Sequence, residues 1–125
     1  MVKPTVEVLV TGGAGFIGSN FVLQALAAHP EWRITTLDKL TYAGRLENLR
    51  DVVDNPRHRF VQGDVADPAL AGPLVQESDI VVHFAAETHV DRSLQDAGAF
   101  INTDVYGSFV LLDAARKAAK LRRFV

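Results

Sequence analysis

The run TGGAGFIG, residues 11–18, joins a short apolar run to an amphipathic stretch that ends near Ala28. A glycine pattern between a strand and a helix is typical of the first turn of a dinucleotide-binding fold. We expect Gly12 to form a tight turn, Gly15 to let a pyrophosphate approach the backbone, and Gly18 to bring the helix near the strand. The free N–H groups at the helix start would then face the anion. The glycines alone would also suit a turn without a ligand, so their context decides.

Asp38 supplies that context. It closes the next apolar run, 20 residues after Gly18, where the second strand of a βαβ unit should end. A carboxylate at this point can hold both ribose hydroxyls and would repel a 2′-phosphate, which favours NAD over NADP as the cofactor. Lys39 is the one neighbour that keeps NADP as an alternative.

The composition fits one globular α/β domain, with 125 residues of which 48% are apolar and 22% charged. The net charge of -2 argues against nucleic acid or an anionic membrane as partner. The chain has no cysteine, which excludes disulfides, thiolate zinc sites and a thiol nucleophile. It shows neither an apolar signal core at its start nor a run of membrane-spanning length, so we expect a cytoplasmic protein.

Short β-like runs alternate with longer helical patterns, as in a parallel sheet covered by helices. We therefore expect a Rossmann-like, doubly wound α/β fold with strand order 3-2-1-4-5. The apolar spacing of the last helical stretch places Ile101, Val105, Phe109, Leu112 and Ala119 on one face, which should help to cover the sheet. The expected strands lie near 5–10, 33–37, 58–62 and 80–84, and the expected helices near 16–28, 46–53, 68–76 and 97–121.

Residues 122–125 read as the start of a fifth strand, and the sequence stops there. We expect residues 1–125 to be an incomplete NAD-binding domain that lacks the C-terminal part of its fold and any substrate domain. The alternative is a small domain with an ordinary frayed terminus.

Two further motifs, DKLTYAG at 38–44 and HFAAETHVDRS at 83–93, are similar to those of the extended short-chain dehydrogenases/reductases. Within that superfamily the chain resembles the dTDP-glucose 4,6-dehydratases. The resemblance implies a lyase of deoxysugar biosynthesis that converts dTDP-glucose to dTDP-4-keto-6-deoxyglucose and water through transient hydride transfer to NAD. It also implies a nucleotide-sugar substrate and a homodimeric full-length protein.

The resemblance assigns cofactor contacts to particular residues. Phe16 and Ile17 join the three glycines at the pyrophosphate. After the second strand, the adenosine ribose is surrounded by Asp38, Lys39, Leu40 and Thr41, and after the third strand adenine is contacted by Asp64 and Val65. After the fourth strand, the nicotinamide half lies beside Phe84, Ala85, Ala86, Glu87 and Thr88, and Thr88 is also near the sugar. Thr103 is a further cofactor contact.

Other polar residues of these motifs receive more modest interpretations. His83 reads as a satisfied core histidine. His89 and Asp91 lack a third ligand at a suitable spacing, so we expect no metal site. Arg92 suits a structural ion pair as well as a substrate diphosphate. Asp104 replaces the usual Asn of the family, and a carboxylate cannot donate a hydrogen bond as an amide does.

The reaction of the superfamily needs a tyrosine with a lysine four residues later. Tyr42 and Tyr106 are followed at that spacing by Leu46 and Val110, so we expect no catalytic residue within these 125 and no activity of the chain alone. Two alternatives stay open for its function: a nucleotide-sugar 4-epimerase or decarboxylase of the same superfamily, and a non-catalytic NAD-binding module.

Overall fold

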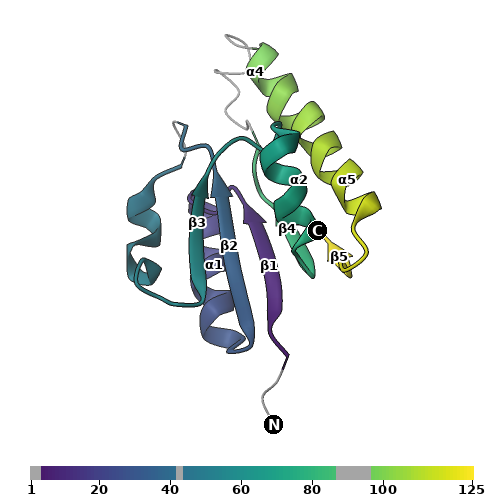
Figure 1. Cartoon of the computed structure of the whole chain (residues 1–125). Coiled ribbons are helices and arrows are strands. Elements are labelled where there is room, and N and C mark those ends of the chain that lie inside the picture. Colours follow the sequence, from purple (N-terminus) through teal and green to yellow (C-terminus); the bar gives the residue numbers. More distant parts are fainter. Residues whose placement is uncertain (1–3, 42–43, 87–96) are drawn as a thin grey trace.

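The computed structural model describes residues 4–41, 44–86 and 97–125. Its centre is a parallel sheet of five strands in the order β3-β2-β1-β4-β5, with helices on both faces (Figure 1). This order confirms the Rossmann-like, doubly wound fold expected from the sequence. The strands are β1 (Val6–Thr11), β2 (Trp32–Asp38), β3 (His58–Gln62), β4 (Ile80–His83) and β5 (Arg123–Phe124). The helices are α1 (Phe16–Ala28), the 3₁₀ helix η1 (Leu46–Val52), α2 (Pro68–Gln76), α4 (Ala97–Ile101), the π-helix η2 (Asn102–Gly107) and α5 (Ser108–Lys117).

The sheet is buried on both sides because β1 and β4 carry apolar residues on both faces. Val8 and Val10 point to the side of α1 and η1, whereas Leu9 points to the side of α2 and α5. Each side therefore has its own apolar cluster, and Figure 1 shows α1 and α2 on opposite faces. The buried centre holds the carboxyl ends of β1, β2 and β4 in fixed positions at one edge of the sheet.

Arg57 closes the carboxyl end of α1. This helix has no basic residue in its last turn, and its final carbonyls need partners. The guanidinium of Arg57 donates to the carbonyl oxygens of Leu26 at 2.8 Å, His29 at 3.0 Å and Trp32 at 3.0 Å. One side chain from the residue before β3 thus joins the end of α1 to the start of β2.

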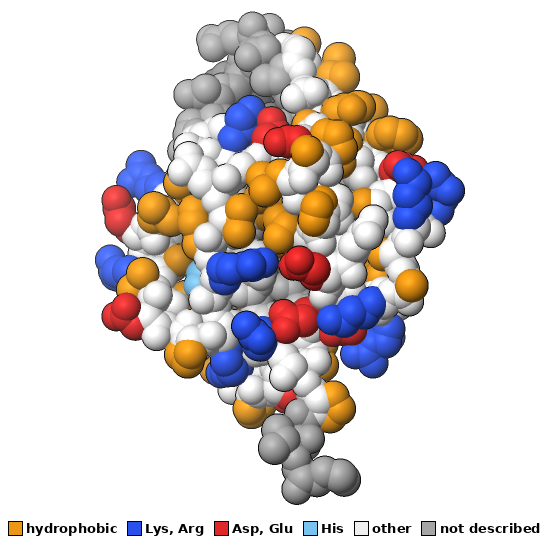
Figure 2. All heavy atoms as spheres, viewed as in Figure 1, with side chains coloured by type: hydrophobic (Ala, Val, Ile, Leu, Met, Phe, Trp, Pro, Cys, Tyr) orange, Lys and Arg blue, Asp and Glu red, His pale blue; other side chains and the backbone are white. Residues whose placement is uncertain are grey.

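The last helical segment differs from expectation in its register. The predicted contact of Ile101, Val105, Phe109 and Leu112 with the sheet is wrong, because these side chains are 52–64% exposed. The prediction is wrong for Ala119 too, which is exposed and lies beyond the end of the helix. The opposite stripe packs inward instead, and it is formed by Gly107, Val110, Leu111 and Ala114. The two small residues let this stripe approach its neighbours closely, since a Cβ on Gly107 would lie 2.6 Å from Cγ2 of Val65. Figure 2 shows hydrophobic side chains along the α4–α5 edge of the molecule.

The same segment also ends earlier than expected. The helix stops at Lys117 because Ala118 adopts extended backbone, with φ -86° and ψ 113°. The chain then enters β5, where Arg123 and Phe124 pair in parallel with Ile80 and Val81. None of the helices in the described part of the chain has the length and apolar character that crossing a bilayer requires.

Candidate cofactor-binding site

A cleft of about 350 Å³ lies at the carboxyl ends of the parallel strands, where open α/β sheets bind their ligands. Its walls come from the turn after β1, the first turn of α1, the loops after β2, β3 and β4, and η2. The lining residues are Gly12, Gly15, Phe16, Ile17, Gly18, Leu37, Asp38, Lys39, Thr41, Gly44, Gly63, Asp64, Val65, Phe84, Ala85, Ala86 and Thr103.

The glycine turn forms the floor of this cleft. Gly12 has φ +68°, a conformation that favours glycine, and a Cβ there would lie 2.7 Å from the backbone nitrogen of Ala85. Gly15 has extended backbone, so its lack of a side chain serves space rather than conformation. A Cβ on Gly15 would meet only the carbonyl oxygen of Gly12, at 3.3 Å, and would otherwise fill open cleft. Gly18 brings α1 against the turn itself, because a Cβ there would overlap the Gly12 carbonyl.

The amino end of α1 opens into the cleft. Its first residues, Phe16 and Ile17, are 81% and 68% exposed, and no side chain caps the helix. The first backbone N–H groups of a helix have no intrahelical partner and carry the positive end of its dipole. This end of the cleft therefore suits an anionic group, and the space above Gly15 suits a bulky one such as a pyrophosphate.

Asp38 presents a fixed carboxylate on the adjacent wall. One oxygen, Oδ2, accepts from the backbone N–H of Ala14 at 2.9 Å, and Oδ1 accepts from that of Leu40 at 2.8 Å. Gly44 lies directly against the carboxylate, since a Cβ there would be 2.6 Å from Oδ1. A carboxylate oxygen has more than one lone pair, so Asp38 can also accept hydrogen bonds from a ligand hydroxyl.

The charge of Lys39 is engaged elsewhere. Its Nζ lies 3.2 Å from Oδ2 of Asp64, which follows β3. The cation that would attract a 2′-phosphate is therefore paired with a carboxylate, and Asp38 adds a second negative charge to this wall. The electrostatics of this wall favour an uncharged ribose over a 2′-phosphorylated one.

The opposite wall follows β4 and is apolar. Phe84, Ala85 and Ala86 line it, and Thr103 from η2 adds a hydroxyl. His83 lies just behind this wall and is half-buried, with hydrogen bonds to Thr11 and Ser108. These two bonds confirm its interpretation as a satisfied core histidine.

Most residues assigned to the cofactor from the sequence lie together in this cleft. Leu40 does not line it: its side chain packs against the core beside α1, while its backbone has φ +60° and its N–H holds Asp38. Glu87 and Thr88 lie outside the described residues, as do His89, Asp91 and Arg92. Three lining residues were missed from the sequence: Leu37, Gly44 and Gly63. A glycine at the end of DKLTYAG and another directly after the third strand were the signals that could have found the latter two.

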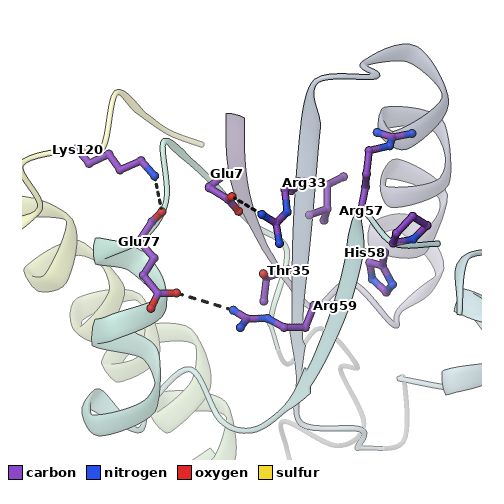
Figure 3. A pocket seen from close by; sticks show the side chains of 10 residues that line it. Glu7, Arg33, Thr35, Arg57, His58, Arg59, Glu77 and Lys120 are labelled. Carbon is purple, nitrogen blue, oxygen red and sulfur yellow. Dashed lines mark hydrogen bonds and ion pairs between the residues drawn. The ribbon is translucent and has the colours of Figure 1, made fainter. Parts of the chain in front are cut away.

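A second hollow lies on the sheet face near the amino ends of the strands, beside the end of α2 (Figure 3). Its charged side chains are largely paired with one another: Arg33 with Glu7 at 3.6 Å, and Arg59 with Glu77 at 3.9 Å. Figure 2 shows basic and acidic side chains interleaved over this part of the face. The hollow is therefore a solvated, ion-paired surface rather than a second site of the same kind.

Comparison with known proteins agrees with this geometry. A dTDP-glucose 4,6-dehydratase of Mycobacterium tuberculosis is 55% identical over 111 residues, which are 89% of this chain and 33% of that protein. The solved dTDP-glucose 4,6-dehydratase of Streptomyces venezuelae with NAD bound superposes with a TM-score of 0.87 and 48% identity, over 94% of this chain and 38% of that one. The UDP-glucose 4-epimerase of Thermotoga maritima superposes with a TM-score of 0.82 and 29% identity, over 95% and 36% of the two chains.

The chain thus spans about a third of the length of the relatives it matches. The family model described as GDP-mannose 4,6 dehydratase matches residues 9–125, which include every described element except the first residues of β1. With the glycine turn, Asp38 and the apolar wall after β4 all inside the matched region, the chain belongs to the GDP-mannose 4,6 dehydratase family.

Proposed function

We propose that residues 1–125 form the NAD-binding domain of a dTDP-glucose 4,6-dehydratase. The observation that carries this proposal is that the uncapped start of α1 and the carboxylate of Asp38 open into one cleft. The identity with dehydratases and the NAD-bound structure of a relative support it.

In this proposal, different groups of the chain contact different parts of the cofactor. The first N–H groups of α1 hold the pyrophosphate, and Asp38 accepts from the ribose hydroxyls. Asp64 and Val65 lie at the adenine. Phe84, Ala85, Ala86 and Thr103 lie beside the nicotinamide, with Glu87 and Thr88 as proposed neighbours and the Thr88 hydroxyl near the sugar. When bound, NAD supplies the hydride acceptor, and the apolar wall after β4 keeps water from its reactive side.

The reaction proposed for the whole protein is loss of water from dTDP-glucose to give dTDP-4-keto-6-deoxyglucose. A tyrosine with a lysine four residues later does not occur in the printed sequence, so the chain alone should bind cofactor without turning over substrate. Formation of a 4-keto-6-deoxy product by these 125 residues would contradict that expectation. The proposal includes a homodimer in the cytoplasm, which sedimentation of the whole protein and cell fractionation would test.

A nucleotide-sugar 4-epimerase is the second candidate, because such an epimerase shares the fold at a TM-score of 0.82. The reaction product distinguishes the two. The whole protein supplied with dTDP-glucose should release a dehydrated 4-keto sugar, whereas an epimerase would return a sugar of unchanged mass. Binding of NAD without any reaction of the whole protein would favour a non-catalytic module.

NAD binding itself is tested by calorimetric titration of the protein and its Asp38→Ala variant. Loss of one or two hydrogen bonds to a charged group costs about 1.5–3 kcal/mol each, so affinity should fall at least tenfold. The matched control is Asp54→Ala, which removes an exposed carboxylate that does not line the cleft. Equal NAD affinity of the protein and Asp38→Ala would remove the proposed role of Asp38, and no binding by either would refute the cofactor proposal.

A further inference from the structure

His83 occupies a junction between three segments of the chain. It is the last residue of β4, and its Nδ1 lies 2.6 Å from Oγ1 of Thr11 at the end of β1. Its Nε2 lies 3.2 Å from Oγ of Ser108, the first residue of α5. The ring therefore bridges the two central strands and the helical segment above them.

The partners of these atoms fix the direction of each hydrogen bond. The Ser108 hydroxyl donates to the carbonyl oxygen of Asp104 at 2.8 Å, so its oxygen accepts from Nε2–H of His83. Nδ1 of a neutral ring then carries no proton and accepts from the Thr11 hydroxyl. The Thr11 oxygen in turn accepts from the backbone N–H of Ala85 at 3.2 Å. Each donor and acceptor in this series of hydrogen bonds is thus used consistently when His83 is neutral and carries its proton on Nε2.

This series of hydrogen bonds connects two segments that together form the wall of the cleft after β4. Ala85 and Thr103 both line the cleft, but they belong to the loop after β4 and to η2. A π-helical turn is rare and occurs mostly as a single turn within an α-helix, frequently at functional sites. The contacts of η2 come from Ser108 at its carboxyl end, which donates to Asp104, and from Gly107, which packs against Val65 of the same cleft.

We propose that His83 is a positioning residue that holds η2, and with it Thr103, in place over the cofactor cleft through the Nε2–H bond to Ser108. The functional part of this inference rests on the proposed NAD site, whereas the tether itself does not. Burial lowers the pKa of His83 from its ordinary value, and the nearby carboxylate of Asp104 acts in the opposite direction. The neutral ring that the hydrogen bonds require is therefore the favoured form at neutral pH.

The test removes the Ser108 hydroxyl and leaves the ring in place. Ser108→Ala should raise amide hydrogen exchange across residues 102–108 and weaken NAD binding about two- to tenfold, as expected for one lost hydrogen bond. Ser78→Ala is the matched control, because Ser78 also donates to a carbonyl four residues earlier, that of Leu74 at 2.7 Å, but has no histidine partner among the described residues. Ser78→Ala should change neither the hydrogen exchange of residues 102–108 nor the NAD affinity. Ser108→Thr keeps the hydroxyl, so both quantities should equal those of the unaltered protein.

The tautomer of the His83 ring gives a second measurement, which would not change if Ser108 only supported the helix. Nitrogen NMR of His83 should show the Nε2–H tautomer in the protein and a mixture of tautomers in Ser108→Ala. An Nδ1–H tautomer in the unaltered protein, or hydrogen exchange in Ser108→Ala equal to that of the Ser78→Ala control, would overturn the tether. If the tether holds but NAD affinity is unchanged in Ser108→Ala, the positioning role is refuted. Failure of the unaltered protein to bind NAD would instead refute the proposed function and leave the tautomer result standing.

Discussion

At Gly44, a single added methyl group should weaken cofactor binding. A Cβ at this position would lie 2.6 Å from Oδ1 of Asp38, which is shorter than real Cβ contacts, and 3.1 Å from Cγ, which is a tight contact. Among the described glycines only Gly12 has a positive φ, so alanine can adopt the backbone of Gly44. In Gly44→Ala the carboxylate must therefore move, while the local backbone need not.

The displacement should cost at least one of the two hydrogen bonds that hold the carboxylate, from Ala14 at 2.9 Å or from Leu40 at 2.8 Å. A hydrogen bond to a charged group contributes about 1.5–3 kcal/mol, and the ligand contact shifts with it. We expect the affinity of Gly44→Ala for NAD to fall roughly 10- to 100-fold in calorimetric titration. Thermal stability should change little, because replacing glycine with alanine also restricts the unfolded chain.

Gly72→Ala is the matched control. It makes the same substitution where nothing lies within 4 Å of the new Cβ, so NAD affinity should stay unchanged. The double variant Gly44→Ala/Asp38→Ala shows whether the effect passes through the carboxylate. It should bind NAD no more weakly than Asp38→Ala alone, because the two changes act on one interaction. Additive losses, or Gly44→Ala binding within twofold of the unaltered protein, would refute the reasoning.

Two further predictions follow from the charges of the molecule. Asp64→Asn should release Lys39 and narrow the preference for NAD over NADP, measured as the ratio of the two dissociation constants; an unchanged ratio would show that the ion pair does not contribute to selectivity. His58 has a pKa lowered by burial, with a hydrogen bond to the backbone of Val52 acting in the opposite direction. Below pH about 6.5 the unfolded chain takes up a proton that the folded chain resists. The free energy of unfolding should therefore decrease as the pH is lowered, by up to about 1.4 kcal/mol per pH unit from this group. Urea titrations of His58→Gln should lack this decrease.

The glycine turn and the strand ends could be predicted because they depend on local spacing. Val6–Thr11, Phe16–Ala28 and His58–Gln62 lie within a residue of their predicted bounds, and Asp67 caps α2 by accepting from the N–H of Ala69. In a parallel sheet the strands bring their carboxyl ends together at one edge, and the amino end of α1 lies at that same edge. The cleft followed from the same rule.

The surroundings of Asp38 could not be predicted in the same way. Leu40 lies two residues from the carboxylate, yet its left-handed backbone turns its side chain into the core and leaves only its N–H at the site. Glycine and asparagine are the usual residues in that conformation, so a leucine gave no signal for it. Gly44 contributes by the absence of a side chain, which has meaning only once the position of Asp38 is known.

The orientation of the last helix was ambiguous for another reason. It carries two apolar stripes, one with Val110 and Leu111 and one with Val105 and Phe109, and the larger side chains belong to the stripe that faces outward. The stripe with Val110 and Leu111 faces the core because the small residues Gly107 and Ala114 let the helix pack closely against it. The π-helical turn also changes the angular spacing of residues before and after it, so one helical period does not describe the whole segment.

The cap that Arg57 forms on α1 has a consequence for the order in which the chain can fold. Leu26, whose carbonyl it binds, is made 31 residues earlier. At synthesis rates of about 5–20 residues per second, α1 exists for roughly two to six seconds before its cap emerges. During that interval α1 is held by packing against β1, β2 and η1, which are all made before Arg57. The first half of the sheet therefore gains its full stability when β3 arrives, and not before.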